Sequence, residues 1–169
     1  MQHLVIMGVA GSGKTTVAGI LAERLGWAIA EADEFHPPQN LARMAAGTPL
    51  TDDDRWPWLD AIARWISSHD EAGLNTIVTC SALRRAYRDV LRSADGRTRF
   101  VHLRGDAELV QDRMAGRVGH FMPTSLLPSQ FATLEPLGAD EDGVVVPISA
   151  SPNSVADEAL RALGLSAAV

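Results

Sequence analysis

The sequence predicts a single α/β domain spanning residues 1–169, with a mostly parallel five-stranded sheet and helices on both faces. Five short apolar runs of strand type alternate with segments whose apolar residues recur at helical spacing. Strands separated by helices form crossover units, which place their strands parallel in one sheet. The 169 residues, with 46% apolar content, are enough for one core, and no linker or internal repeat divides them.

The five expected strands follow one another along the chain. They span residues 4–7, 27–32, 76–80, 100–103 and 144–148. The first run is apolar without alternation, which is typical of a strand buried on both faces. Pro147 lies inside the last run and indicates an edge position or an early strand end, because proline cannot donate a hydrogen bond to a neighbouring strand.

Helical patterns occupy most of the gaps between these strands. Apolar stripes lie at residues 17–25, 59–66, 109–114 and 155–163. Gly26 and Gly164 are expected to end the first and last helices, and Asp106 is expected to cap the third. The segment 119–143 has few regular signals beyond a short helical stretch near residues 131–134. We therefore expect a mobile lid and surface loop there, with the lid spanning approximately residues 113–136.

Composition and charge exclude several classes of protein. The formal net charge of −6 disfavours a general affinity for nucleic acid or for an anionic membrane. No apolar run approaches the roughly 20 residues that a membrane span needs. The N-terminal apolar stretch runs directly into a glycine-rich motif, as a strand would and a signal peptide would not. The single cysteine, Cys80, cannot form an internal disulfide, which suits a reducing cytoplasm.

The strongest motif is the run Gly-Val-Ala-Gly-Ser-Gly-Lys-Thr at residues 8–15, which fits G-x-x-x-x-G-K-[ST] at every fixed position. The glycines let successive backbone N–H groups face inward as a nest for phosphate oxygens, and the helix N-terminus adds a favourable dipole. Lys14 is predicted to reach the β- and γ-phosphates of ATP, and the Thr15 hydroxyl to bind Mg²⁺. The nucleotide-binding candidates are Gly8, Gly11, Ser12, Gly13, Lys14, Thr15 and Thr16, although Thr16 reads more simply as a helix residue.

The loop alone does not identify a reaction, since ATPases, switch proteins and kinases all contain it. The second strand ends in acids, and ligands bind beyond the carboxyl ends of parallel strands. Asp33 is therefore expected to hold Mg²⁺ through water or to accept the proton of an attacking hydroxyl, with a helix cap as the alternative. Glu31 and Glu34 are expected to be solvated or one contact removed from the ligands. His36 follows in the same loop, where it either hydrogen-bonds a hydroxylated substrate or is structural.

Three further blocks resemble the gluconate kinase (gluconokinase) family. The first covers residues 31–37, 40, 44, 47, 49–50 and 52–59; the second covers 80–89 and 91–92; the third covers 120–123, 126–127, 129–131 and 134–136. With the phosphate loop, the resemblance extends over most of the chain up to Pro136. Ala32 stands where the family usually has glycine, and Arg43 where it usually has lysine.

The resemblance implies a three-layer P-loop NTPase fold and an ATP:D-gluconate 6-phosphotransferase activity. The products would be 6-phospho-D-gluconate and ADP, which belong to sugar-acid catabolism through the pentose phosphate or Entner–Doudoroff route. It also implies Mg²⁺ as a cofactor and a homodimer as the assembly.

The arginines of these blocks suit such a substrate. Gluconate is a chain of hydroxyls with one carboxylate, so its site needs a fixed cation at one end. Arg55 and Arg84 are the candidates for a forked contact with that carboxylate, although Arg55 could instead pair with the acids at 52–54. For Arg85, Arg88 and Arg92 on the following helix, a solvated face, an ion pair and a ligand contact are all open. Core packing is the better interpretation of Trp56, Trp58 and Trp65.

The expected lid carries further cations. Arg113 and Arg117 are four residues apart and share one helix face, and His120 follows as a candidate substrate contact. In P-loop metabolite kinases such a segment folds over the nucleotide, and its arginines stabilise charge during transfer. The alternative is a solvated basic helix end. Two rival functions stay open, namely another small-molecule kinase of shikimate or nucleoside monophosphate type, and a nucleotide-dependent switch without phosphotransfer.

Overall fold

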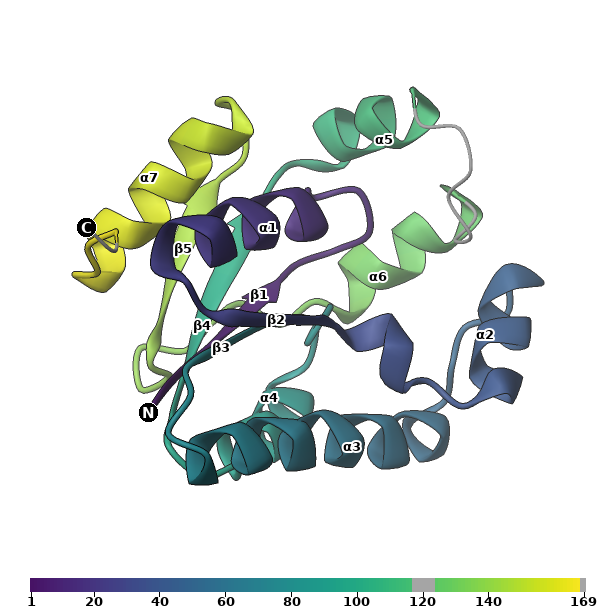
Figure 1. Ribbon diagram of the computed structural model, residues 1–169. Coiled ribbons are helices and arrows are strands. Elements are labelled where there is room, and N and C mark those ends of the chain that lie inside the picture. The colour runs from purple at the N-terminus through teal and green to yellow at the C-terminus, as the bar shows by residue number, and fades with distance from the viewer. Residues whose placement is uncertain (117–123, 168–169) are drawn as a thin grey trace.

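The computed structural model describes residues 1–116 and 124–167, which form an α/β fold around one sheet (Figure 1). Its strands are β1 (Gln2–Met7), β2 (Ala28–Glu31), β3 (Thr76–Thr79), β4 (Arg97–Arg104) and β5 (Gly143–Pro147). Its α-helices are α1 (Lys14–Leu25), α2 (Pro38–Ala45), α3 (Asp52–Glu71), α4 (Arg85–Arg92), α5 (Ala107–Ala115), α6 (Leu127–Thr133) and α7 (Pro152–Leu163). Two short 3-10 turns, η1 (Ala32–Phe35) and η2 (Thr124–Leu126), complete the described elements.

All strand pairs in the sheet are parallel, in the order β2-β3-β1-β4-β5. Helices α1 and α7 cover one face, and α3 and α4 cover the other, so the domain has three layers (Figure 1). The carboxyl ends of β1, β2 and β3 meet at one edge, where α2 and α6 also lie. Ligand sites in open parallel sheets form at this edge.

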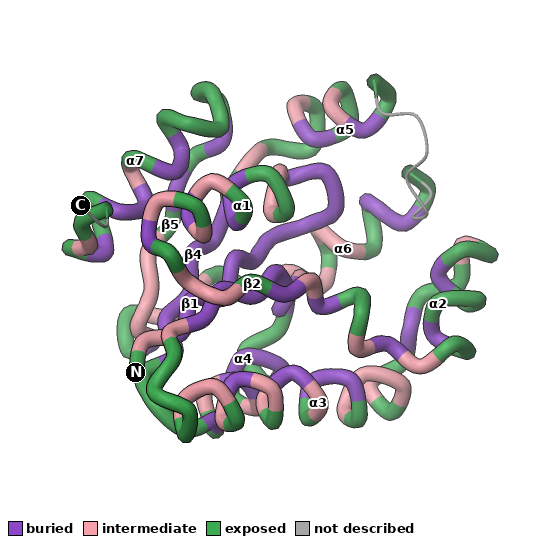
Figure 2. Tube along the Cα trace, in the orientation of Figure 1, coloured by how far each residue is buried: buried purple, intermediate pink, exposed green. Residues whose placement is uncertain are grey.

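Side chains of β1 alternate between two apolar cores. Leu4 and Ile6 pack with residues of α1, α5 and α7, whereas Val5 and Met7 pack with residues of α3 and α4. All four are fully buried, as the central position of the strand requires (Figure 2). The uninterrupted apolar run in the sequence therefore marked a strand covered on both faces, as expected.

The expected strands are all present, with boundaries that differ by at most three residues. Gly26 and Gly164 end α1 and α7 in the left-handed conformation, and the Asp106 carboxylate accepts a hydrogen bond from the Leu109 N–H, as predicted. Pro147 ends β5, an edge strand. The stretch expected near residues 131–134 is the C-terminal part of α6. Helix α2 was not predicted, because its eight residues form no apolar stripe. Met44 is its one buried apolar residue.

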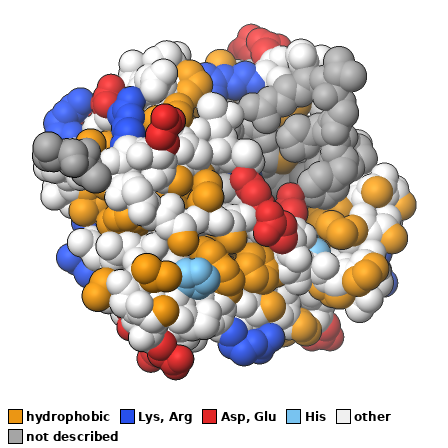
Figure 3. Space-filling model, viewed as in Figure 1, with side chains coloured by type: hydrophobic (Ala, Val, Ile, Leu, Met, Phe, Trp, Pro, Cys, Tyr) orange, Lys and Arg blue, Asp and Glu red, His pale blue; other side chains and the backbone are white. Residues whose placement is uncertain are grey.

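The face shown in Figure 3 intersperses hydrophobic side chains with acidic and basic ones. Large exposed hydrophobic residues are scattered over the described surface, at Met1, Ile29, Leu41, Leu74 and Val145. Within residues 1–116 and 124–167, no helix is long and apolar enough to cross a membrane.

Candidate active site

The phosphate cradle lies between β1 and α1. Gly11 adopts a φ of 77°, and a Cβ added there would lie 2.5 Å from Met114 Cγ on α5. The loop therefore needs glycine both for its backbone angle and for the close approach of α5. Gly13 occupies the N-cap of α1 in the left-handed conformation without a side-chain cap from the described residues. The first N–H groups of a helix have no acceptor within the helix, so this end of α1 suits an anion.

Polar groups of the cradle are arranged around this helix end. The Lys14 ammonium donates to the carbonyls of Gly8 and Val9 at 3.1 and 3.0 Å, so it folds back over the loop. The Ser12 hydroxyl is buried and has no hydrogen-bond partner among the described residues. The Ala10 N–H donates to the side-chain carbonyl of Gln130 at 2.7 Å, which ties α6 to the loop. A buried hydroxyl and open helix N–H groups are what a phosphate requires.

The acids after β2 lie beside the cradle, as predicted. Asp33 and Glu31 line a cavity of about 110 Å³ together with Lys14 and Thr15. Asp33 lies inside the η1 turn, whose N-cap is Glu31, so the helix-cap alternative for Asp33 is wrong. The Glu31 carboxylate accepts hydrogen bonds from the hydroxyls of Thr15 and Thr79, at 3.2 and 2.5 Å. Glu31 therefore contacts the Thr15 hydroxyl, the predicted metal-binding group, and its role one contact away from the ligand stays a prediction.

A larger cavity of about 420 Å³ adjoins the cradle. Its walls come from α2, α3, α4, α6 and the segment after β3. His36, Ser81 and Gln130 line this cavity and the cradle cavity alike, so the two spaces share a wall. Arg55 and Arg84, the predicted carboxylate contacts, both line the larger cavity. The structure thus brings together His36, Arg55 and Arg84, which are separated by up to 48 residues in the sequence.

His36 is nearly buried and stacks on Trp58, with ring centres 4.1 Å apart. Burial, together with the nearby Arg55 charge, lowers its pKa to about 4. The ring is therefore neutral at pH 7. Its Nδ1 accepts from the Asn40 side-chain amide at 3.3 Å, which places the ring proton on Nε2. A neutral imidazole N–H suits a hydroxyl group better than a carboxylate.

Asp52 and Tyr87 line the larger cavity beside Arg55 and Arg84. The sequence analysis assigned neither residue a role in binding. The Tyr87 hydroxyl donates to Asp52 Oδ1 at 2.5 Å and accepts from Arg55 Nη1 at 3.1 Å. Burial and the Asp52 carboxylate raise the pKa of Tyr87. The Arg55–Asp52 ion pair named as the alternative for Arg55 is present at 3.7 Å, in addition to the cavity-lining position.

Arg113 lies on α5, at a third cavity of about 280 Å³. Its Nη2 donates to the Ile148 carbonyl at 2.5 Å, and Thr16 lines the same space. Arg113 does not line the cavities that contain Asp33 and Arg55. The other two lid candidates, Arg117 and His120, lie outside the described residues, as does the sequence block at 120–123.

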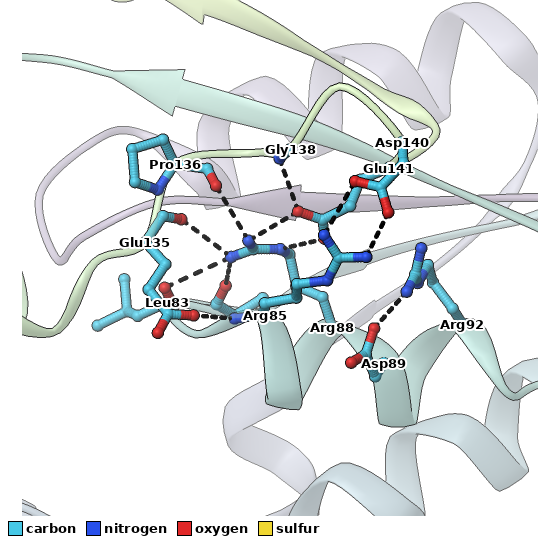
Figure 4. A network of polar contacts seen from close by, with 11 residues as sticks. Leu83, Arg85, Arg88, Asp89, Arg92, Glu135, Pro136, Gly138, Asp140 and Glu141 are labelled. Atoms are coloured by element: carbon cyan, nitrogen blue, oxygen red, sulfur yellow. Dashed lines mark hydrogen bonds and ion pairs between the residues drawn. The ribbon is translucent and has the colours of Figure 1, made fainter.

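A buried ion pair links α4 to the segments after β3 and after α6 (Figure 4). Arg88 is fully buried and donates to both Glu141 carboxylate oxygens, at 2.7 and 2.9 Å. Its guanidinium also donates to carbonyls of the segment after β3 and of the segment after α6, namely those of Ala82, Leu83, Glu135 and Pro136. Arg88 therefore has the ion-pair role, and so do Arg85 with Asp140 and Arg92 with Asp89.

The tryptophans match their predicted packing role in part. Trp58 is buried in the core beneath α3, and Trp56 and Trp65 are partly buried against the same cluster. Trp58 additionally lines both cavities, and its indole N–H donates to the Ala32 carbonyl at 2.7 Å. Cys80 is buried, and this burial raises the pKa of its thiol to about 12, so the thiol is protonated at pH 7.

Comparisons with known proteins agree with this geometry. An AAA domain family model matches residues 4–121. The gluconokinase of Gluconobacter oxydans is 49% identical over 160 residues, covering 95% of this chain and 90% of that protein. The thermoresistant gluconokinase of Escherichia coli is 42% identical, covering 84% and 81%.

Solved structures show the same fold. The crystal structure of a sugar kinase from Janibacter sp. superposes with a TM-score of 0.94 at 52% identity, covering 98% of this chain and 95% of that one. A gluconokinase from Sinorhizobium meliloti gives a TM-score of 0.87 at 44% identity, covering 96% and 91%. With the phosphate cradle, the acid after β2 and the arginine-lined cavity in place, this chain belongs to the gluconokinase family.

Proposed function

We propose that this chain transfers the terminal phosphate of ATP to the 6-hydroxyl of D-gluconate. The observation that carries the proposal is the shared wall between the cradle and the larger cavity. One end of the combined space offers phosphate-binding groups, and the other offers two guanidinium groups. A short molecule with a hydroxyl at one end and a carboxylate at the other fits this arrangement, with its carboxylate at the guanidinium groups.

The donor nucleotide is proposed to bind with its phosphates in the cradle and its base in the adjoining third cavity. The triphosphate is proposed to contact the backbone N–H groups at the start of α1, the Ser12 hydroxyl and the Lys14 ammonium. In the present arrangement Lys14 donates to loop carbonyls, and a bound phosphate would replace them as the stronger, charge-assisted partner. The cavity between Thr16, Arg113 and the segment after β5 is proposed to receive the base. Arg113 would then contact the nucleotide from α5.

The oxygen groups beside the cradle fit Mg²⁺. Thr15, Glu31 and Asp33 supply hydroxyl and carboxylate oxygens, the ligand type that this hard cation prefers. Thr15 and Asp33 are proposed to hold the ion, directly or through water, with Glu31 orienting the Thr15 hydroxyl. When bound, Mg²⁺ offsets the charge of the phosphate oxygens. Within the described residues, no group of three or more His, Cys, Asp or Glu side chains is placed to hold a metal ion.

The acceptor is proposed to extend from the arginines to Asp33. Arg55 and Arg84 bind its carboxylate, and the neutral His36 donates from Nε2 to a chain hydroxyl. Asp33 faces the 6-hydroxyl, whose proton it accepts as the oxygen attacks the γ-phosphorus. Arg117 and His120 are proposed to join the site from the lid, and lid closure would exclude water that competes with the acceptor.

An acceptor screen tests this function. Purified protein with ATP and Mg²⁺ is given gluconate, other sugar acids, shikimate and nucleoside monophosphates, and ADP release is followed. We expect the highest kcat/KM with gluconate, and ³¹P and ¹³C NMR should place the phosphate on carbon 6. Faster turnover of shikimate or a nucleotide would favour the rival kinases. Slow hydrolysis without stimulation by any acceptor would favour a switch protein.

We further propose a homodimer in a reducing cytoplasm. The buried, unreactive Cys80 needs no oxidising compartment. Light scattering on the purified protein would give twice the chain mass of 18.1 kDa for a dimer, and the chain mass itself would contradict the proposal.

A further inference from the structure

The larger cavity, proposed to bind the acceptor and called the acceptor cavity from here on, contains a carboxylate of the protein beside Arg55 and Arg84. Asp52 is the first residue of α3 and lies between Arg55 and Arg84. Its Oδ2 accepts from Arg84 Nη1 at 3.4 Å, and its Oδ1 lies 3.7 Å from Arg55 Nη1. The buried Tyr87 hydroxyl fixes Oδ1 at 2.5 Å. The guanidinium carbons of Arg55 and Arg84 lie 5.3 and 6.0 Å from the centre of the Tyr87 ring.

Helix capping does not explain this placement. Three acids, Asp52, Asp53 and Asp54, occupy the first turn of α3, where negative charge is favourable. Asp54 and Thr51 form the capping box, with both reciprocal hydrogen bonds present. Asp53 is exposed and lines neither cavity. Of the three, Asp52 is the residue that contacts both arginines and lines the acceptor cavity.

The charges decide what this end of the cavity accepts. Two arginines and one aspartate give a formal charge of +1, so an acid with one negative charge neutralises the cluster. A phosphate monoester, with two negative charges above its second pKa of about 6, would leave one charge unmatched beside Asp52. Like charges brought together in a partly enclosed pocket disfavour binding and so give specificity.

We propose that Asp52 sets the charge specificity of the acceptor site, which admits a carboxylate at the arginine end and rejects a dianionic phosphate there. The inference rests on the proposed function, because it takes Arg55 and Arg84 as contacts of the acceptor's carboxylate. It adds that the protein's own carboxylate, and not the arginines alone, determines which anion binds.

Calorimetry on the complete chain tests the inference without turnover. MgADP first saturates the cradle, so that added phosphate groups compete only for the acceptor cavity. D-gluconate and D-glucitol 1-phosphate are then titrated at pH 8, the second having a dianionic phosphate in place of the carboxylate. Uncharged D-glucitol is the third titrant and reports changes that are not electrostatic. The variants are Asp52→Asn, which keeps an acceptor oxygen for Tyr87, and Asp53→Asn as the matched control on the same helix turn.

In the wild type we expect gluconate to bind more tightly than glucitol 1-phosphate, with a preference that weakens as salt is raised. Asp52→Asn should reduce this preference by about tenfold, mainly through tighter binding of the phosphate, while Asp53→Asn changes it by less than about twofold. Equal effects of the two substitutions, or an unchanged preference in Asp52→Asn, would overturn the inference but leave the proposed function intact. A wild type that binds no gluconate would refute the proposed function, and the inference with it.

Discussion

Replacing Arg88 with methionine should destabilise the domain strongly, because it leaves a buried carboxylate without its partner. Arg88 and Glu141 are both 0% exposed in their side chains. Burial alone would raise the pKa of Glu141, yet hydrogen bonds from Arg88 and from the Gly138 N–H outweigh it and hold that pKa below its usual range. The ionised pair is thus the stable form in the folded protein. In Arg88→Met the Glu141 carboxylate must stay buried and unpaired or take up a proton.

The expected magnitude follows from the contacts in Figure 4. Breaking one partner of a buried ion pair lowers the free energy of unfolding by about 3–5 kcal/mol. The carbonyls of Ala82, Leu83, Glu135 and Pro136 also lose a charged donor, so the upper half of that range applies. For a chain of this size, about 4–5 kcal/mol corresponds to a fall in Tm of roughly 8–20 °C.

Urea unfolding followed by tryptophan fluorescence, with thermal melts, measures the effect. The double variant Arg88→Met/Glu141→Leu should be more stable than Arg88→Met, although it lacks more hydrogen bonds, because the buried charge is gone. The deficit of Arg88→Met should shrink as the pH falls through the acidic range in which Glu141 becomes protonated. A loss below about 1 kcal/mol in Arg88→Met, or a double variant less stable than the single one, would refute this reasoning.

The remaining predictions concern the cradle and its neighbours. Lys14→Ala should lower kcat by at least about 10²-fold with an unchanged Tm, and near-normal turnover would show that the cradle is misassigned. Asp33→Asn should lower kcat by about 10²–10⁴-fold with little change in the Kd of ATP, whereas a raised KM alone would assign Asp33 to binding. Gly11→Ala should weaken both ATP binding and stability, the latter by about 1–3 kcal/mol, since φ is 77° and Met114 lies in the way; calorimetry and melts check both. The pKa of His36 is lowered to about 4, so its stabilising contribution is complete above pH 6.5 and is lost as the pH falls from 6.5 to 4; an NMR titration showing a pKa near 6.5 would contradict its burial.

The sequence predicted the parts of this site that depend on local pattern. Residues 8–15 have a fixed spacing whose geometry depends on the loop itself, so the cradle follows from them directly. Asp33 could be placed because it closely follows a strand, and ligands bind at that edge of a parallel sheet. Arg55 and Arg84 were chosen because they lie in the blocks that resemble the gluconokinase family, and both line the larger cavity.

Other features depended on packing between distant segments, which no local pattern encodes. Arg88 has the sequence context of an ordinary exposed helix residue, and its burial requires Glu141, which is 53 positions away. Gln130 contacts the cradle because α6 folds back over it, and the loop's own motif contains no sign of this contact. Tyr87 and Asp52 form one unit across 35 positions. Of the three clustered acids at 52–54, sequence alone could not distinguish the one that contacts both arginines.

A crystal structure with a non-hydrolysable ATP analogue, Mg²⁺ and gluconate would show whether donor and acceptor meet where the two cavities share a wall. We expect the acceptor's carboxylate on Arg55 and Arg84, and its 6-hydroxyl oxygen about 3–3.5 Å from the γ-phosphorus and within hydrogen-bond reach of Asp33. A complex with the carboxylate away from both arginines, or with Asp33 directed away from acceptor and metal alike, would contradict this expectation.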